Sequence, residues 1–467
     1  MSFTSLSFWI FFAVVFASYW LARTRKWQNV VLLFASYVFY GWIQPWLALM
    51  LGISTLADFL LATGMKTSPT RSRPYLWLSL VLNLGTLAFF KYYDFFHDDL
   101  ARIAESLGMQ GDFLLTTVLL PAGLSFYTLK KLGYMIDVSR GTFQPTPSLI
   151  DFALYVSFFP QIVAGPIDRH QKLMPQIESA RVWRAEHFHS AWPLILMGLF
   201  KKIVIANTVG SFTTRIFNLE EPTLLLAITG ALGFTLQILA DFSAYTDLSR
   251  GVACLLGFDT SENFKSPYLS LTPTDFWNRW HITLSTWLRD YVFFPLRRYV
   301  LGRQHRLPNL AVQAIPPLAT MLLSGLWHGA GWRYLIWGAM YGILIVAYQT
   351  LGMGGSWKPG SPVTAILAWM VMFSFIVFGW MIFAAPSMGW VFNALSNPIT
   401  GSLQQQAVAL IGLSMTLVYA IPLIVDMIIE RHAKAGPLLG PLFHAAVTAT
   451  IFIYINSATP DFIYFQF

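Results

Sequence analysis

Residues 322–332 read Leu-Leu-Ser-Gly-Leu-Trp-His-Gly-Ala-Gly-Trp and join two apolar segments, 310–327 and 332–350. A helix needs about 20 mostly apolar residues to cross a bilayer, and each segment comes close to that length. The stretch therefore predicts two membrane helices joined by a glycine-rich turn, with His328 inside the apolar region. An ionisable residue at that depth is costly, and this makes His328 a candidate for function.

Three glycines, Gly325, Gly329 and Gly331, remove side-chain bulk around His328, so that backbone or substrate can approach it. A neutral imidazole with a pKa near the usual value of about 6.5 is a competent general base at cellular pH. The alternative is a structural histidine that hydrogen-bonds across helices. Spacing alone leaves both interpretations open, and His328 is the first candidate for catalysis.

The composition extends the membrane prediction to the whole chain. The 467 residues are 56% hydrophobic and 11% charged, whereas soluble domains carry roughly a quarter charged residues. The net charge of +8 comes from Lys and Arg scattered between apolar segments, which favours positive-inside topology over nucleic-acid binding. The sequence predicts an all-α integral membrane protein. Candidate spans lie at residues 7–22, 29–43, 46–63, 75–92, 113–129, 149–163, 190–209, 223–240, 310–327, 332–350, 363–384, 407–429 and 440–457.

Some of these segments are expected to be re-entrant, which leaves roughly eleven full crossings. The run Leu6–Leu21 is expected to be a retained first span, with its N-terminus away from the cytoplasm. An acidic loop at Asp94–Asp99 is expected to lie opposite the basic loops. Three basic groups are predicted to face the cytoplasm, namely Arg23, Arg25 and Lys26; Lys66, Arg71 and Arg73; and Lys130, Lys131 and Arg140.

Two stretches, 160–184 and 258–307, are too polar to span a membrane. In the second, residues 275–281 read Asp-Phe-Trp-Asn-Arg-Trp-His. As a helix this pairs Asp275 with Arg279 and forms an aromatic stripe that is typical of an interfacial helix. An interfacial helix leaves His281, among these aromatic residues, unexplained. The predicted stripe consists of Phe276, Trp277, Trp280, Leu284 and Trp287.

Basic residues follow this helix, and they are either topology determinants or a phosphate site. Guanidinium groups bind phosphate through two hydrogen bonds, so a donor such as coenzyme A could dock there. The basic residues are Arg297, Arg298, Arg303 and Arg306.

Two further motifs contain polar groups near membrane depth. Asp241 and Asp247 are explained either by capping and pairing with Arg250 or by burial beside the polar centre. Residues 159–169 contain two prolines and a glycine, which favours a re-entrant turn. A metal site is not expected, because Cys254 is the only cysteine and no HExxH motif is present.

These stretches together resemble the membrane-bound O-acyltransferase (MBOAT) family, within it the bacterial polysaccharide branch typified by the membrane subunit of alginate O-acetylation. The resemblance rests on residues 120–127, 136–138, 160–169, 241–247, 263–295, 323–337 and 462–467. It implies helices around a central tunnel, with divisions at 1–111, 112–350 and 351–467. Arg297-Arg298 replace a Gly-Gly pair common in the branch, and Tyr341 stands where a histidine is frequent. Tyr341 is therefore not expected to be essential to the chemistry.

The resemblance also implies an activity. His328 matches the invariant family histidine and is expected to act as the base, while His281 matches the second histidine and positions the reacting groups. The donor is acetyl-CoA, or an acyl carrier as in teichoic-acid D-alanylation, and no cofactor or metal is expected. Supporting residues are Asp275, Asn278 and Arg279 around His281, Trp327 and Ser324 near His328, and Arg289, Arg297 and Arg298 toward the donor.

The acceptor is expected to be a polysaccharide outside the bacterial cytoplasmic (inner) membrane, reached directly or through an extracytoplasmic acetyltransferase partner. D-alanyl or another acyl transfer from a carrier protein is the alternative within the enzyme class. A membrane transporter with His328 as a proton relay is the alternative from another class. No pair of matching interrupted segments supports the transporter.

Overall fold

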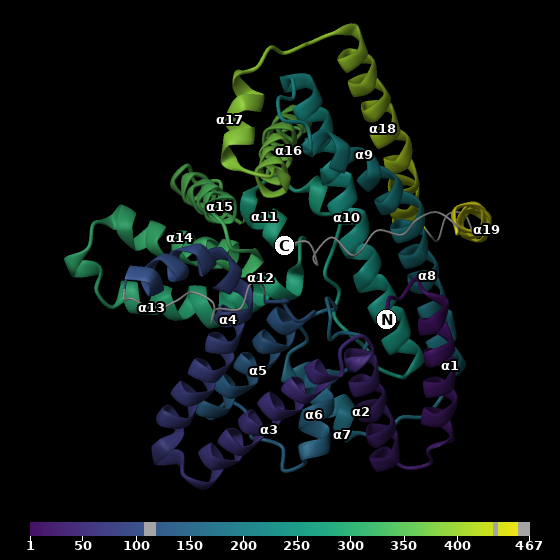
Figure 1. Cartoon of the computed structure of the whole chain (residues 1–467), viewed down its shortest axis with the longest axis vertical. Helices are drawn as coiled ribbons and strands as arrows, with labels where there is room; N and C mark the ends of the chain where they lie inside the picture. The colour runs from purple at the N-terminus through teal and green to yellow at the C-terminus, as the bar shows by residue number, and fades with distance from the viewer. Residues whose placement is uncertain (107–117, 356, 433–437, 456–467) are drawn as a thin grey trace. The chain divides into compact units, whose positions relative to one another are not determined.

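The computed structural model describes residues 1–106, 118–355, 357–432 and 438–455, and over these residues the chain is helical with no strand. It forms two compact units (Figure 1). Unit 1 comprises Met1–Trp192 and Leu248–Ser261, and unit 2 comprises Pro193–Asp247 and Glu262–Phe467. The predicted division at residues 111 and 112 and the ending 462–467 lie outside the described residues. The prediction of an all-α membrane protein is confirmed.

Unit 1 is built from helices of 9 to 35 residues, and ordinary capping chemistry is present at several of their ends. The Ser5 hydroxyl accepts a hydrogen bond from the backbone N–H of Phe8, and Pro45 occupies the first turn of its helix. The helices of this unit are α1 Leu6–Leu21, α2 Arg25–Gly41, α3 Pro45–Thr67, α4 Ser72–Ser106, α5 Leu124–Ser139, α6 Leu149–Ser157 and α7 His170–Glu178.

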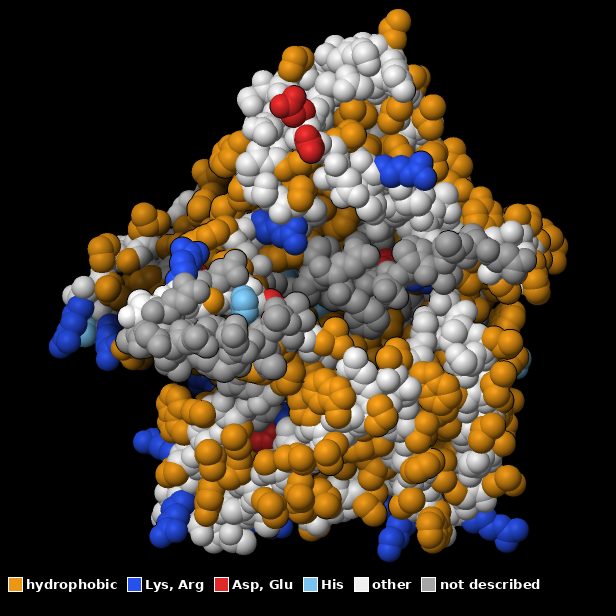
Figure 2. Space-filling model, viewed as in Figure 1, with side chains coloured by type: hydrophobic (Ala, Val, Ile, Leu, Met, Phe, Trp, Pro, Cys, Tyr) orange, Lys and Arg blue, Asp and Glu red, His pale blue; other side chains and the backbone are white. Residues whose placement is uncertain are grey.

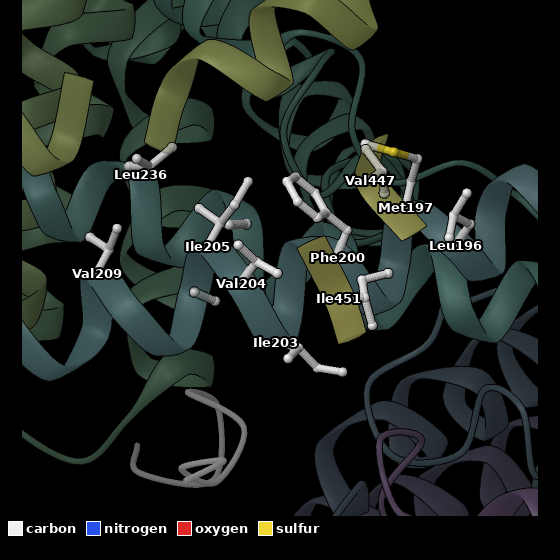
Figure 3. Packing of buried hydrophobic residues seen from close by; sticks show 12 residues of the cluster. Leu196, Met197, Phe200, Ile203, Val204, Ile205, Val209, Leu236, Val447 and Ile451 are labelled. Atoms are coloured by element: carbon white, nitrogen blue, oxygen red, sulfur yellow. The ribbon is translucent and has the colours of Figure 1, made fainter. Parts of the chain in front are cut away.

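Unit 2 contains the remaining helices, two of which, α8 and α10, begin or end in unit 1. A π-helical segment, Lys201–Ala206, joins α8 to α9, and its apolar side chains pack with α10 and α19 (Figure 3). The helices are α8 Ala185–Phe200, α9 Asn207–Phe217, α10 Leu224–Leu255, α11 Pro273–Trp277, α12 Ile282–Leu288, α13 Phe294–Leu301, α14 Asn309–His328, α15 Trp332–Thr350, α16 Pro362–Ala384, α17 Met388–Ser396, α18 Leu403–His432 and α19 Leu439–Tyr454.

Apolar side chains cover much of the visible surface in Figure 2, as expected of a protein solvated by lipid. Helix α18, for example, exposes Leu410, Leu417 and Ile421. Among the described residues, seven helical segments are long and apolar enough to cross a bilayer, and α1 and α19 are shorter apolar helices. The chain is therefore a multi-pass membrane protein, and the figure of roughly eleven crossings stays a prediction.

Two parts of the predicted loop pattern are wrong. The acidic residues Asp94 and Asp99 belong to α4, which remains helical as far as Ser106. Lys130 and Lys131 do not lie in a basic loop, because both are buried within α5. Lysine is almost never fully buried without a partner, and both side chains have one.

The two lysines of α5 hold the interior of unit 1 together. The Lys131 ammonium lies 3.1 Å from an Asp58 carboxylate oxygen, and both side chains are 1% exposed. The Lys130 ammonium donates a 3.0 Å hydrogen bond to Gln161, whose amide nitrogen donates to Asp168 at 2.6 Å. The bonds from Lys130 tie the irregular stretch 158–169 to α5, and backbone hydrogen bonds within that stretch join Gln161 to Phe158 and Gly165 to Gln161.

Candidate active site

His281 occupies an unusual backbone conformation between two short helices. Thr272 caps α11 and Pro273 fills its first turn, but the helix ends after Trp277. His281 then has φ 42° and ψ 54°, in the left-handed region that non-glycine residues rarely adopt. The predicted continuous aromatic helix is therefore wrong, since the chain breaks at His281 before α12 begins at Ile282.

A segment that precedes α11 holds this turn in place. The Ile282 N–H donates to the Asn263 carbonyl at 3.0 Å, and the Lys265 N–H donates to the Arg279 carbonyl at 3.0 Å. The Asn263 side-chain oxygen accepts from the Thr283 N–H at 3.1 Å and from the Thr283 hydroxyl at 2.7 Å. A strained backbone conformation persists only when the surrounding structure holds it in place. These four hydrogen bonds hold the chain before and after His281.

His328 is the last residue of α14, and the glycines around it allow α15 to pack closely. A Cβ on Gly325 would lie 2.2 Å from the Tyr334 carbonyl oxygen, and a Cβ on Gly329 would lie 2.2 Å from the Tyr334 ring. Gly331 has φ 151°, a conformation that favours glycine. The backbone and the side-chain ring of Tyr334 on α15 thus fill the space beside Gly325 and Gly329.

Gly325→Ala is expected to lower the melting temperature of the purified protein by several degrees, because α14 and α15 must separate to accommodate the methyl group. Gly85→Ala on α4 is the matched control, since an added Cβ there meets nothing within 4 Å. The measurement is thermal unfolding of both variants in the same detergent. Equal melting temperatures for the two variants would contradict the close contact.

The two histidines meet around one indole ring. The ring centroid of Trp327 lies 6.0 Å from that of His281 and 4.9 Å from that of His328. His281 is 1% exposed and His328 is 4% exposed. The structure thus brings together the histidines that lie 47 positions apart in the sequence, together with the predicted supporting residue Trp327.

Aromatic side chains complete the surroundings of the histidines. Trp337 and Phe383 pack edge-on against His328, with ring centroids 5.1 and 5.4 Å away, and Phe242 packs against His281 at 4.7 Å. Burial among these groups lowers the pKa of His281, which lies outside the membrane-spanning helices, to about 3. His281 is therefore neutral at cellular pH, with one nitrogen as a donor and one as an acceptor.

Tyr341 and its neighbours extend the aromatic cluster. Tyr341 stacks on Phe276 at an interplanar angle of 7°, and Trp277 and Trp337 pack edge-on against it. The Tyr341 hydroxyl and the indole nitrogens of Trp277, Trp337 and Trp380 are buried, and none has a hydrogen-bond partner among the described residues. The cluster therefore presents several hydrogen-bond donors that a bound acceptor could use.

The other predicted supporting residues differ in burial: some are exposed or partly exposed, and one is buried. Asp275 and Arg279 form the expected ion pair at 2.7 Å on a partly exposed face, where such a pair stabilises little. Asn278 is exposed, whereas His281, three positions later, is buried. Ser324 is buried on α14. Their proposed roles toward the histidines stay predictions.

Asn263 is the polar residue that sequence reasoning missed. Its side chain is fully buried, and its amide oxygen accepts two hydrogen bonds from Thr283, the second residue after His281. Eighteen positions separate it from His281, so neither helical periodicity nor motif spacing connects the two residues. Only the fold places Asn263 beside the turn.

The predicted donor-binding arginines lie on accessible surface. Arg289 pairs with Asp290 at 3.0 Å in the π-helical segment Arg289–Phe293, and Arg297 and Arg298 are exposed on α13. Exposed guanidinium groups remain available to an anionic ligand. Binding of a phosphate-bearing donor by these residues stays a prediction.

Asp241 and Asp247 are not helix caps. Both lie inside α10 and form ion pairs of 2.8 Å, Asp241 with Lys202 and Asp247 with Lys201. Both lysines belong to the π-helical segment Lys201–Ala206. The interpretation based on burial agrees with Asp241, which is nearly inaccessible and immediately precedes the His281 neighbour Phe242.

Several known proteins are similar to this chain in amino-acid sequence. A family model described as membrane-bound O-acyltransferase matches residues 143–388. The probable alginate O-acetylase AlgI of Pseudomonas aeruginosa is 38% identical over 391 residues, which are 83% of this chain and 73% of that protein. The peptidoglycan O-acetyltransferase of Helicobacter pylori is 31% identical over 85% of this chain and 79% of its own length. A teichoic acid D-alanyltransferase of Bacillus subtilis is 29% identical over 56% of this chain and 68% of its own length.

Proposed function

Because the chain belongs to the membrane-bound O-acyltransferase family and is therefore an O-acyltransferase, we propose that it transfers acetyl groups from acetyl-CoA to a polysaccharide hydroxyl. The donor is cytoplasmic and the acceptor lies outside the cytoplasmic membrane. Transfer to the polymer is direct or is completed by an extracytoplasmic partner protein. Two relatives whose names specify O-acetylation, one of alginate and one of peptidoglycan, support this choice of acyl group and acceptor.

The observation that carries the proposal is the pair of buried histidines whose rings both pack against Trp327. His328 accepts the proton of the attacking hydroxyl as its oxygen bonds to the thioester carbonyl carbon. The carbon–sulfur bond then breaks, and the proton passes from His328 to the departing thiolate. His281, neutral because of its burial, orients the reacting groups by hydrogen bonding.

The surroundings of the histidines suit this reaction. Low exposure limits competing hydrolysis of the thioester by water and strengthens hydrogen bonds to the reacting atoms. The exposed arginines on α13 are the proposed contact for the phosphates of coenzyme A. The reaction uses acetyl-CoA as a substrate and requires no resident cofactor.

A donor competition tests the proposal. The purified protein in liposomes is supplied with radiolabelled acetyl-CoA and a hydroxyl-bearing glycan, with and without a carrier protein loaded with an acyl group that bears a different label. Label transfer from acetyl-CoA that the loaded carrier does not suppress is the expected result. Transfer only from the carrier would favour the second candidate, D-alanyl or other carrier-dependent transfer, which the teichoic acid relatives suggest.

A further inference from the structure

We propose that the side-chain amide nitrogen of Asn263 donates a hydrogen bond to the carbonyl oxygen of the acyl group at the reaction centre. The inference rests on the proposed acyl transfer and adds a residue to it. Asn263 has two functions in this proposal, since its oxygen holds the turn at His281 while its nitrogen contacts the substrate.

The orientation of the Asn263 amide follows from its partners. The Thr283 backbone N–H can only donate, and it lies 3.1 Å from the atom assigned as oxygen. The Thr283 hydroxyl lies 2.7 Å from the same atom. An amide nitrogen in that position would face a donor, so the oxygen must face Thr283 and the nitrogen must point elsewhere.

The Asn263 nitrogen is buried and has no acceptor among the described residues. Buried donors without an acceptor are rare in folded proteins because burial removes their water hydrogen bonds. An acceptor that arrives with a ligand resolves this cost. A bound water molecule is the other way to satisfy the nitrogen, and the experiment below distinguishes the two.

The position of Asn263 relative to His281 is fixed by packing as well as by hydrogen bonds. Phe264, the next residue, contacts Trp280 at 4.9 Å and Phe242 at 5.0 Å between ring centroids. Phe242 in turn contacts the His281 ring at 4.7 Å. Asn263 is thus bonded to the residues that follow His281 and precedes a ring that packs with the neighbours of His281.

The chemistry requires a donor of this kind. When the hydroxyl oxygen attacks the thioester carbon, the carbonyl oxygen gains negative charge before the carbon–sulfur bond breaks. A prearranged N–H in a buried site stabilises that charge more than water does, and the loss of one such donor lowers kcat by about 10²–10³-fold in other acyl-transfer enzymes.

The test compares Asn263→Asp with Thr283→Val in the purified full chain, assayed with acetyl-CoA. Aspartate keeps an acceptor for Thr283 but loses the N–H donor, whereas valine removes one bond from the turn and leaves the Asn263 nitrogen intact. We expect kcat to fall about 10²-fold or more in Asn263→Asp at high pH and less than tenfold in Thr283→Val. Wild-type turnover in Asn263→Asp, or equal losses in both variants, would overturn the donor role and favour a water-filled or purely structural site.

The pH dependence of Asn263→Asp gives a second readout. A carboxylic acid donates a hydrogen bond only while protonated, and burial raises the pKa of a carboxyl group. Its residual activity should therefore fall, relative to wild type, as the pH rises through that pKa. A profile parallel to wild type would also overturn the donor role.

If the aspartate variant does not fold, Asn263→Ala replaces it, and a loss of kcat no larger than that of Thr283→Val would overturn the proposal. These outcomes differ from failure of the proposed function, in which the folded wild-type protein itself transfers no acyl group from acetyl-CoA.

Discussion

The purified His328→Ala protein is expected to transfer acetyl groups from acetyl-CoA about 10²–10⁴ times more slowly than wild type. In the proposed mechanism His328 accepts the hydroxyl proton, and its buried position leaves no bulk water to replace the missing side chain. The measurement is kcat for label transfer at saturating donor. The KM for acetyl-CoA should change little, because His328 acts on the proton and not on the phosphates.

His305→Ala is the matched control for that experiment. His305 also belongs to unit 2 but is exposed, in the short turn Gln304–Arg306. Both variants should elute as folded protein, and His305→Ala should keep wild-type turnover. Wild-type turnover in folded His328→Ala would remove His328 as the base and restore its interpretation as a structural histidine.

Lys131→Met is expected to lower the stability of the protein by about 3–5 kcal/mol, because Asp58 would keep a buried charge without its partner. Asp58 also accepts hydrogen bonds from the Ser79 hydroxyl at 2.6 Å and the Asn83 amide at 2.8 Å. These neutral donors do not cancel a full negative charge. Thermal unfolding in detergent measures the effect as a lower melting temperature.

Two variants make that result interpretable. Lys66→Met removes an exposed lysine from α3, the helix that carries Asp58, and should leave the melting temperature within about a degree of wild type. The double variant Asp58→Asn with Lys131→Met removes both charges and should recover much of the loss. If Lys131→Met and Lys66→Met have the same melting temperature, the buried pair contributes nothing to stability.

The membrane class and the helical pair that carries His328 could be predicted from the sequence. The predicted segments 310–327 and 332–350 correspond to α14, Asn309–His328, and α15, Trp332–Thr350. These elements were predictable because their signal is local: apolar length defines the helices, and glycines around His328 define the turn.

Features that depend on distant partners could not be predicted. The aromatic helix breaks at His281 because Asn263 and Lys265 bond to the backbone around it, and no residue near His281 signals a break. The sequence predicts that Lys130 and Lys131 belong to a cytoplasmic basic loop, because it does not show that Gln161 and Asp58 are their partners in the interior. In both cases tertiary hydrogen bonds override the local pattern.

Stability and acyl transfer are expected to favour different residues at position 281, because His281 has a left-handed backbone conformation. Glycine or asparagine would suit φ 42° better than histidine, so either substitution would relax the turn. Random variants screened only for resistance to heat should therefore accumulate them at this position, whereas variants screened for acetyl transfer should retain the imidazole. Retention of histidine under the activity screen would identify residue 281 as a site where the chain loses some stability for the sake of the proposed acyl transfer.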